Sequence, residues 1–169
     1  MSNVAAPLLA GFSVSTIGIV LTGEPSLRWP GFILVSLTVA SVAFIMCVQF
    51  GFHARQHLYS PADVSSWWSE EDVRAHTADL ESEQRRDFAR WALWTVWARR
   101  FYSTGIVALW FGVGSALCPT PDDHGSTGLL RWVAASIALG AGLGELCWSV
   151  VPAWRRRRRR ARILDGQRP

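Results

Sequence analysis

The uncharged run Pro30–Gly51, PGFILVSLTVASVAFIMCVQFG, decides the fold class of this chain. At about 1.5 Å per helical residue, it is long enough to cross an apolar layer roughly 30 Å thick. Backbone amides find no water partner inside such a layer, so the run is expected to be a helix with internal hydrogen bonds. The runs Val4–Thr22 and Phe101–Cys118 are also uncharged, and Trp132–Val151 is apolar except for Glu145. The sequence therefore predicts an all-α polytopic membrane protein with four transmembrane helices.

The positive charges are sorted between the connecting segments. All 17 are arginines, and 15 of them fall between the second and third runs or in the C-terminal tail, whereas Arg28 and Arg131 lie in the other connections. Arginine-rich segments stay in the cytoplasm. We therefore expect a multi-pass protein of the cell (inner) membrane with both termini in the cytoplasm, and with Glu24 and the segment 122–124 outside.

The chain divides into four parts on this basis. Residues 1–51 form a first transmembrane hairpin, 52–100 a cytoplasmic helical segment, 101–152 a second transmembrane hairpin and 153–169 a basic cytoplasmic tail.

The predicted cytoplasmic segment contains two signals for the start of a helix. Ser60 followed by Pro61, and Ser69 followed by Asp72, each have the form of a helix start. An apolar stripe at helical spacing then runs without a breaker into the third span, which predicts one long helix over roughly Ala78–Cys118. The second span is expected to continue past Phe52 toward Ser60, giving an antiparallel helical pair.

Three tryptophans of the long helix, Trp91, Trp94 and Trp97, have two interpretations. Indole rings are favoured at membrane boundaries, so the residues are expected to anchor the helix there. The alternative is a surface for a cytoplasmic protein partner, which requires the rings to face away from lipid and from their own neighbours.

Glu145 is the one acidic residue inside a predicted span. A carboxylate there is a candidate ion or proton site, or a partner for an arginine of another protein, because charge inside a membrane is costly. The structural alternatives are a protonated carboxyl or a hydrogen bond to Gln49, Ser103 or Thr104. Glu24, at the outer mouth, is the second candidate for a selective charge.

Small residues recur every fourth position on the fourth span, at Ser136, Gly140 and Gly144, and Ala138 and Gly142 lie on an adjoining stripe. Such spacing lets helix backbones approach closely. The contact is expected within one four-helix bundle, with a homo-oligomer as the alternative.

His53 and His57 share one helix face, a spacing that holds a metal only when further ligands converge. Interfacial polarity is the simpler interpretation, and we expect no metal site.

The tail contains six consecutive arginines, which fix topology and are candidate contacts for anionic lipid head groups: Arg155, Arg156, Arg157, Arg158, Arg159 and Arg160. No aromatic residue interleaves with them to stack on bases, so no nucleic-acid partner is expected. The sequence holds no phosphate-binding loop, no nucleophile elbow and no zinc-protease motif. We therefore expect no cofactor and no enzymatic activity.

Several motifs carry a resemblance that covers most of the chain. Pro7–Phe12 (PLLAGF), Arg28–Gly31 (RWPG), Cys47–Tyr59 (CVQFGFHARQHLY), Ser60–Trp68 (SPADVSSWW) and Gln84–Arg100 are similar to uncharacterised four-span membrane proteins of actinobacteria. That resemblance implies the topology but no activity.

A fainter similarity is to Orai calcium channels, through Leu8–Phe12 (LLAGF), Pro30 with Gly31 and Phe101–Thr104 (FYST). It implies four spans with both ends cytoplasmic. The Orai pore depends on an acidic ring in the first span, whereas here that span is uncharged and Glu24 lies beyond it.

Together these features predict a nonenzymatic membrane protein that anchors or recruits a cytoplasmic partner through its helical connector. The alternative is an oligomeric ion or proton channel.

Overall fold

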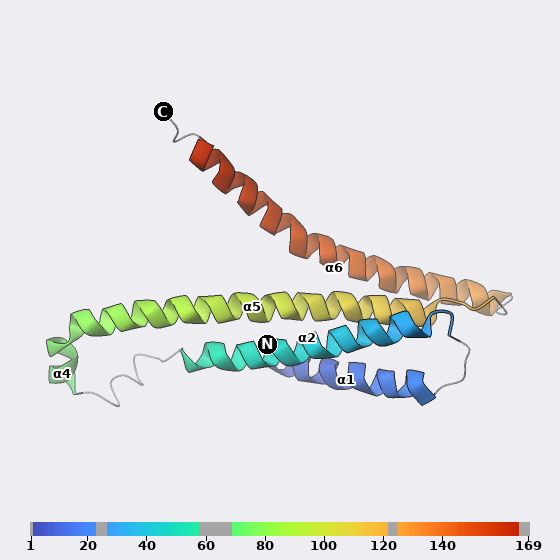
Figure 1. Ribbon diagram of the computed structural model, residues 1–169, viewed down its shortest axis with the longest axis horizontal. Helices are drawn as coiled ribbons and strands as arrows, with labels where there is room; N and C mark the ends of the chain where they lie inside the picture. The colour runs from blue at the N-terminus through green and yellow to red at the C-terminus, as the bar shows by residue number, and fades with distance from the viewer. Residues whose placement is uncertain (1, 23–26, 58–68, 122–124, 166–169) are drawn as a thin grey trace.

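The computed structural model describes residues 2–22, 27–57, 69–121 and 125–165. These residues form helices and short connections with no strand, as Figure 1 shows. In chain order the helices are α1 (Ser2–Thr22), α2 (Pro30–Gln56), the short α4 (Glu70–Ala75), α5 (Thr77–Leu117) and α6 (Ser126–Asp165). The all-α prediction is confirmed for this part of the chain.

Three helices of the described part are long and apolar enough to cross a membrane: Val4–Thr22, Pro30–Gln56 and Ser126–Val151. They correspond to the first, second and fourth predicted spans. The third predicted span, Phe101–Cys118, forms the C-terminal part of α5 and is not among them. α5 ends at Leu117, one residue before Cys118, so 18 helical residues that end there include the charged Arg100 as well as the polar Ser103 and Thr104.

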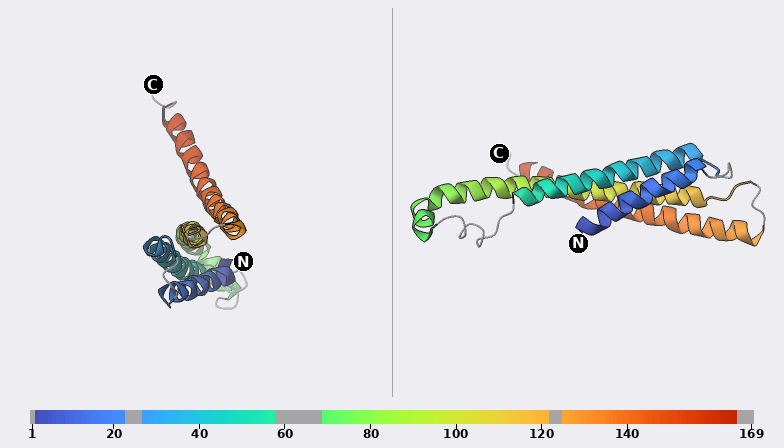
Figure 2. Two further views of the ribbon diagram at one scale, coloured as in Figure 1. Left: turned by 90° about the vertical axis from the view of Figure 1, so that its right-hand side faces the viewer. Right: turned by 90° about the horizontal axis from the view of Figure 1, so that it is seen from below.

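α2 is the central helix of the molecule. It contacts α5 along most of its length in an antiparallel pair, and α1 packs on another side of it (Figures 1 and 2). Ile33, Leu37, Ala40 and Phe44 are fully buried between these helices. An uninterrupted apolar run supplies such contacts on more than one face, which explains why the second span is the helix that holds the bundle together.

Gly105 of α5 lets the two helices approach closely at Phe44. A Cβ atom at Gly105 would lie 2.7 Å from Phe44 Cε1, closer than real Cβ contacts allow. Farther along, a Cβ at Gly112 would lie 3.0 Å from Leu37 Cδ2. Glycine is therefore needed at Gly105 because the ring of Phe44 occupies the space that a side chain would fill.

α6 packs on α5 over the first part of its length and then diverges from it. Ala135 and Ala138 are buried, and Gly142 faces Trp110 of α5. The C-terminal part of α6 leaves the bundle and ends well away from the other helices (Figures 1 and 2). Contact with α5 thus involves the stripe that contains Ala138 and Gly142, which confirms close packing within the bundle for that stripe.

The predicted long helix, which joins the segment 52–100 to the third predicted span, is present. α5 begins at Thr77 and continues without a break to Leu117, close to the predicted range Ala78–Cys118. α4 begins directly after Ser69, where the sequence predicted a helix start. α2 ends at Gln56, and the predicted start at Ser60 lies outside the described residues.

Candidate functional site

An aromatic cluster joins the C-terminal part of α2 to the middle of α5. Phe50 of α2 stacks on Trp94 of α5, with ring centroids 5.4 Å apart and planes at 19°, and lies 5.2 Å from the ring of Phe101. His53, one turn farther along α2, also lies 5.4 Å from Trp94. Aromatic pairs of this kind contribute about 0.5–1.5 kcal/mol each beyond their area burial. The cluster formed by Phe50, His53, Trp94 and Phe101 therefore holds the helical pair together.

The three predicted partner-surface tryptophans have different surroundings. Trp94 faces α2 within the aromatic cluster and is half-buried. Trp97 lies 6.5 Å from Phe50 of α2 and 6.2 Å from Phe101, but it remains 40% exposed. Trp91 packs on Phe88 of its own helix, with centroids 5.2 Å apart. The structure thus leaves Trp97, and in part Trp91, for contact with lipid or a partner, whereas Trp94 is engaged within the molecule.

A polar contact lies at the end of the helical pair. His57 Nδ1 is 3.4 Å from Asp87 Oδ1, and Arg90 Nη1 is 3.7 Å from the same oxygen. Glu81 and Arg85, one turn apart on α5, form an ion pair at 3.6 Å with both side chains largely exposed. Solvent-exposed pairs contribute at most about 1 kcal/mol, so these contacts orient the helices more than they stabilise them.

The two histidines that share a face of α2 are directed to different neighbours. His53 lies on Trp94, and His57 lies on Asp87. Over the residues that the structure describes, no group of three or more His, Cys, Asp or Glu side chains could hold a metal ion.

Sequence reasoning missed Phe50 and Asp87 as the residues that link the two helices. A signal was present, because Phe50, His53 and His57 recur at i, i+3 and i+7 and so share the α2 face that meets α5. Within an apolar run, however, that spacing does not distinguish a face that meets a helix from one that meets lipid.

The side of α5 turned away from α2 carries an exposed apolar stripe. Ala89, Leu93 and Val96 follow one another at helical spacing, and Leu93 and Val96 are 55% and 48% exposed. Exposed arginines flank the stripe at both ends: Arg85, Arg86, Arg99 and Arg100. The Arg100 guanidinium lies 5.3 Å from the Trp97 ring centroid, close enough for a cation–π contact. We call Ala89, Leu93 and Val96 the outer stripe of α5.

Glu145 lies at the contact between α6 and α5. The Ser103 hydroxyl donates a hydrogen bond to Glu145 Oε1 over 3.5 Å, and Glu145 is half-buried. Ser103 is one of the three partners that the sequence suggested for this carboxyl. The distance is long for a hydroxyl donor, for which about 2.7–2.8 Å is typical, so the bond is weak.

The remaining candidate residues lie on α6 or outside the described residues. Glu24 lies outside the described residues, and the backbone of Arg155–Arg160 is part of α6. On α6, Ser136, Gly140 and Gly144 are exposed, and a Cβ at Gly140 or Gly144 would meet nothing within 4 Å. This stripe faces away from the bundle, in contrast to Ala138 and Gly142.

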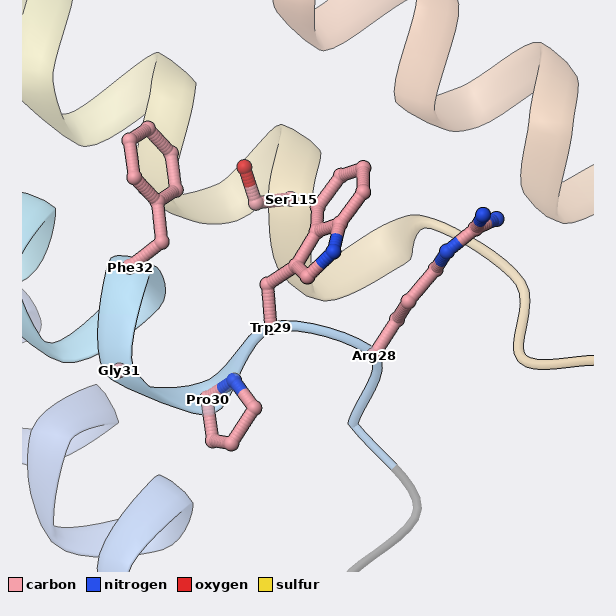
Figure 3. Close-up of a pocket in the computed structure, with 6 residues that line it drawn as sticks. All are labelled: Arg28, Trp29, Pro30, Gly31, Phe32 and Ser115. Atoms are coloured by element: carbon pink, nitrogen blue, oxygen red, sulfur yellow. The ribbon is translucent and has the colours of Figure 1, made fainter.

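A hollow that the sequence did not predict lies at the N-terminal end of α2 (Figure 3). It has a volume of about 620 Å³ and is lined by Arg28, Trp29, Pro30, Gly31, Phe32 and Ser115. The Arg28 guanidinium lies 5.1 Å from the Trp29 ring centroid and points away from Ser115 (Figure 3). The hollow is a shallow, open surface, and its residues include no pair of nucleophile and base.

Within its described residues, the chain is thus an all-helical protein with three helices long and apolar enough to cross a membrane, which makes it compatible with a membrane protein. Comparison with protein-family models, with curated proteins and with solved structures finds no match.

Proposed function

We propose that this chain is a nonenzymatic integral protein of the cell membrane that anchors or recruits a cytoplasmic protein through the helical pair of α2 and α5. In this proposal the chain spans the membrane four times with both termini in the cytoplasm, as the arginine distribution and the resemblance to four-span actinobacterial proteins suggest.

The packing of α5 on α2 supports membrane insertion of the third predicted span, Phe101–Cys118. Gly105 lies against Phe44 and Gly112 lies against Leu37, both within the most apolar part of α2. A helix that follows a spanning helix over this stretch lies at the same depth in the bilayer. The backbone N–H and C=O groups of α5 also bond to one another, as the interior of a bilayer requires, because the helix is continuous.

The observation that carries the anchoring role is the length of α5. Its 41 residues make one helix, about 60 Å long at 1.5 Å per residue, whereas the apolar layer is roughly 30 Å thick. The N-terminal half of α5 therefore projects from the membrane, supported by α2 only as far as the contact between His57 and Asp87.

The outer stripe of α5 supplies a docking face on this projection. Leu93 and Val96 are exposed, and the arginines at both ends favour a partner with apolar side chains flanked by carboxylates. Trp97, at the edge of the stripe, is the type of residue that dominates protein interfaces.

Site-specific photo-crosslinking in cells tests this function. A photoreactive residue at Leu93 is expected to give an adduct with one defined protein, because the side chain faces the docking partner. The same residue at Val42, which is exposed on α2 within the span, is the matched control and is expected to contact only lipid. Identical adducts at both positions, or none at Leu93 in cells that express the protein normally, would contradict the proposal.

An oligomeric ion or proton channel is the second candidate. It is supported by the open small-residue stripe Ser136, Gly140 and Gly144, which lies on the same helix as Glu145 and could bring copies of that carboxyl together. The particle mass of the detergent-solubilised protein tests the homo-oligomer. Gly140→Leu is expected to reduce that mass, whereas Leu130→Ala on the exposed outer part of α6 is not.

A further inference from the structure

A second cavity lies near the cytoplasmic end of α2, far from the hollow of Figure 3. Its volume is about 160 Å³. α1 contributes Ala6, α5 contributes Ala98, and one face of α2 contributes the remaining lining residues: Cys47, Val48, Gly51, Phe52 and Arg55. The α2 residues recur every three or four positions, so the cavity runs lengthwise along that helix.

The chemistry of the lining changes along the cavity. At its deep end, Cys47 and Val48 belong to the uncharged run that decides the fold. Arg55 lies eight residues farther along α2, about 12 Å toward the cytoplasm, and is exposed. Arg99 directly follows the lining residue Ala98 on α5 and is also exposed. The cavity is thus apolar in the membrane and positively charged at its rim.

We propose that this cavity binds one acyl chain of an anionic phospholipid from the cytoplasmic leaflet, with the lipid phosphate held by Arg55. A guanidinium presents paired N–H donors that match a phosphate group. The apolar wall of Val48, Gly51 and Phe52 contacts the upper part of the chain. The inference rests on the membrane insertion in the proposed function, but it requires no protein partner.

The size and depth of the cavity favour a lipid over a soluble ligand. Sites for small soluble molecules typically have volumes of about 300–1,000 Å³, so this cavity is too small for most of them. A stretch of one flexible chain fits, and the rest of the lipid remains in the bilayer. Because the deep end lies beside a spanning helix, the ligand enters from the membrane.

Native mass spectrometry of the full-length protein tests the site. Resistance to alkaline extraction first establishes insertion; the purified protein is then titrated with phosphatidylglycerol or with phosphatidylcholine of the same acyl chains. Wild type is expected to bind phosphatidylglycerol more tightly. Arg55→Gln should weaken that binding about fivefold, and Val48→Trp should abolish binding of both lipids by filling the cavity.

The matched controls are Arg28→Gln, which removes an arginine at the other end of α2, and Val42→Trp, which places the same indole on a lipid-exposed position. Both are expected to bind as wild type. Gly51→Leu fills the same cavity with a smaller side chain and replaces Val48→Trp if that variant loses helicity.

Equal affinity for the two lipids, or undiminished phosphatidylglycerol binding in Arg55→Gln or in the filled variants, would overturn the inference. Crosslinking from Leu93 in the otherwise wild-type protein, compared with its lipid binding, separates this result from the anchoring role. Lipid binding with no protein adduct would refute the anchoring role alone, and a protein adduct without lipid binding would refute the lipid site alone.

Discussion

Ser103 donates a hydrogen bond to Glu145 over 3.5 Å and so links α5 to α6 by their side chains. Glu145 lies three residues after Gly142, which packs on Trp110 of α5. A carboxyl at this position is therefore bound to its neighbouring helix on one side and remains partly accessible on the other.

Removing the hydroxyl of Ser103 is expected to have a small effect on stability. Hydrogen bonds between membrane helices contribute on average about 0.6 kcal/mol, and this one is long. Ser103→Ala should therefore lower the free energy of unfolding by less than about 1 kcal/mol in mixed micelles of lipid and detergent. The control is Ser149→Ala, which removes an exposed hydroxyl from α6. A loss above about 2 kcal/mol would mean that Ser103 and Glu145 belong to a larger polar network.

Ion or proton flux decides whether Glu145 also has a transport role. In the anchoring proposal, wild-type protein in liposomes conducts neither protons nor monovalent cations. In the channel alternative it conducts, and Glu145→Gln abolishes the flux because the amide carries no charge. Ser103→Ala is the control, since it leaves the carboxyl in place. Equal flux in wild type and Glu145→Gln would exclude this carboxyl as the selective group.

The close approach of Gly105 and Phe44 predicts a localised sensitivity to side-chain size. Gly105→Ala places a methyl group against the Phe44 ring, and overpacking of this kind costs about 1–3 kcal/mol. Gly140→Ala meets nothing within 4 Å and is the matched control, expected to be neutral or slightly stabilising because alanine favours helix. Thermal unfolding in detergent measures both. Phe44→Leu should partly restore Gly105→Ala by making room for the methyl group.

Cysteine labelling from outside intact cells tests the four-span topology. With Cys47, Cys118 and Cys147 replaced by serine or alanine, Pro121→Cys is expected to react with a membrane-impermeant maleimide, and Ala75→Cys is expected to react only after the cells are opened. The reason is that α5 crosses the membrane between these two positions in the proposed topology. Labelling of Ala75→Cys in intact cells would overturn it.

The helices themselves were predictable because their signals are local. Apolar runs mark α1, α2 and the Trp132–Val151 part of α6, and the unbroken apolar stripe before Phe101 predicts that the segment before it and the third apolar run form one helix. The sequence limited the expected hydrogen-bond partners of Glu145 to three residues, because only side chains at a similar depth in the predicted membrane can reach this carboxyl.

The contacts between helices were less predictable, since they depend on which face of an apolar helix meets a neighbour. Phe50 and Phe52 are two residues apart on α2, yet Phe50 packs on Trp94, whereas Phe52 is 61% exposed. Likewise, Gly142 faces α5 and Gly140 faces outward. In lipid, both faces of such a helix are apolar, so composition alone does not separate them.

The unbroken backbone of α5 has a mechanical consequence. A helix with every internal hydrogen bond in place resists bending, so a force applied near Leu80 is transmitted as tilt or rotation to Gly105 and Gly112, where the helix fits against α2. Whatever engages the N-terminal end of α5 thereby acts on the packing between α5 and α2.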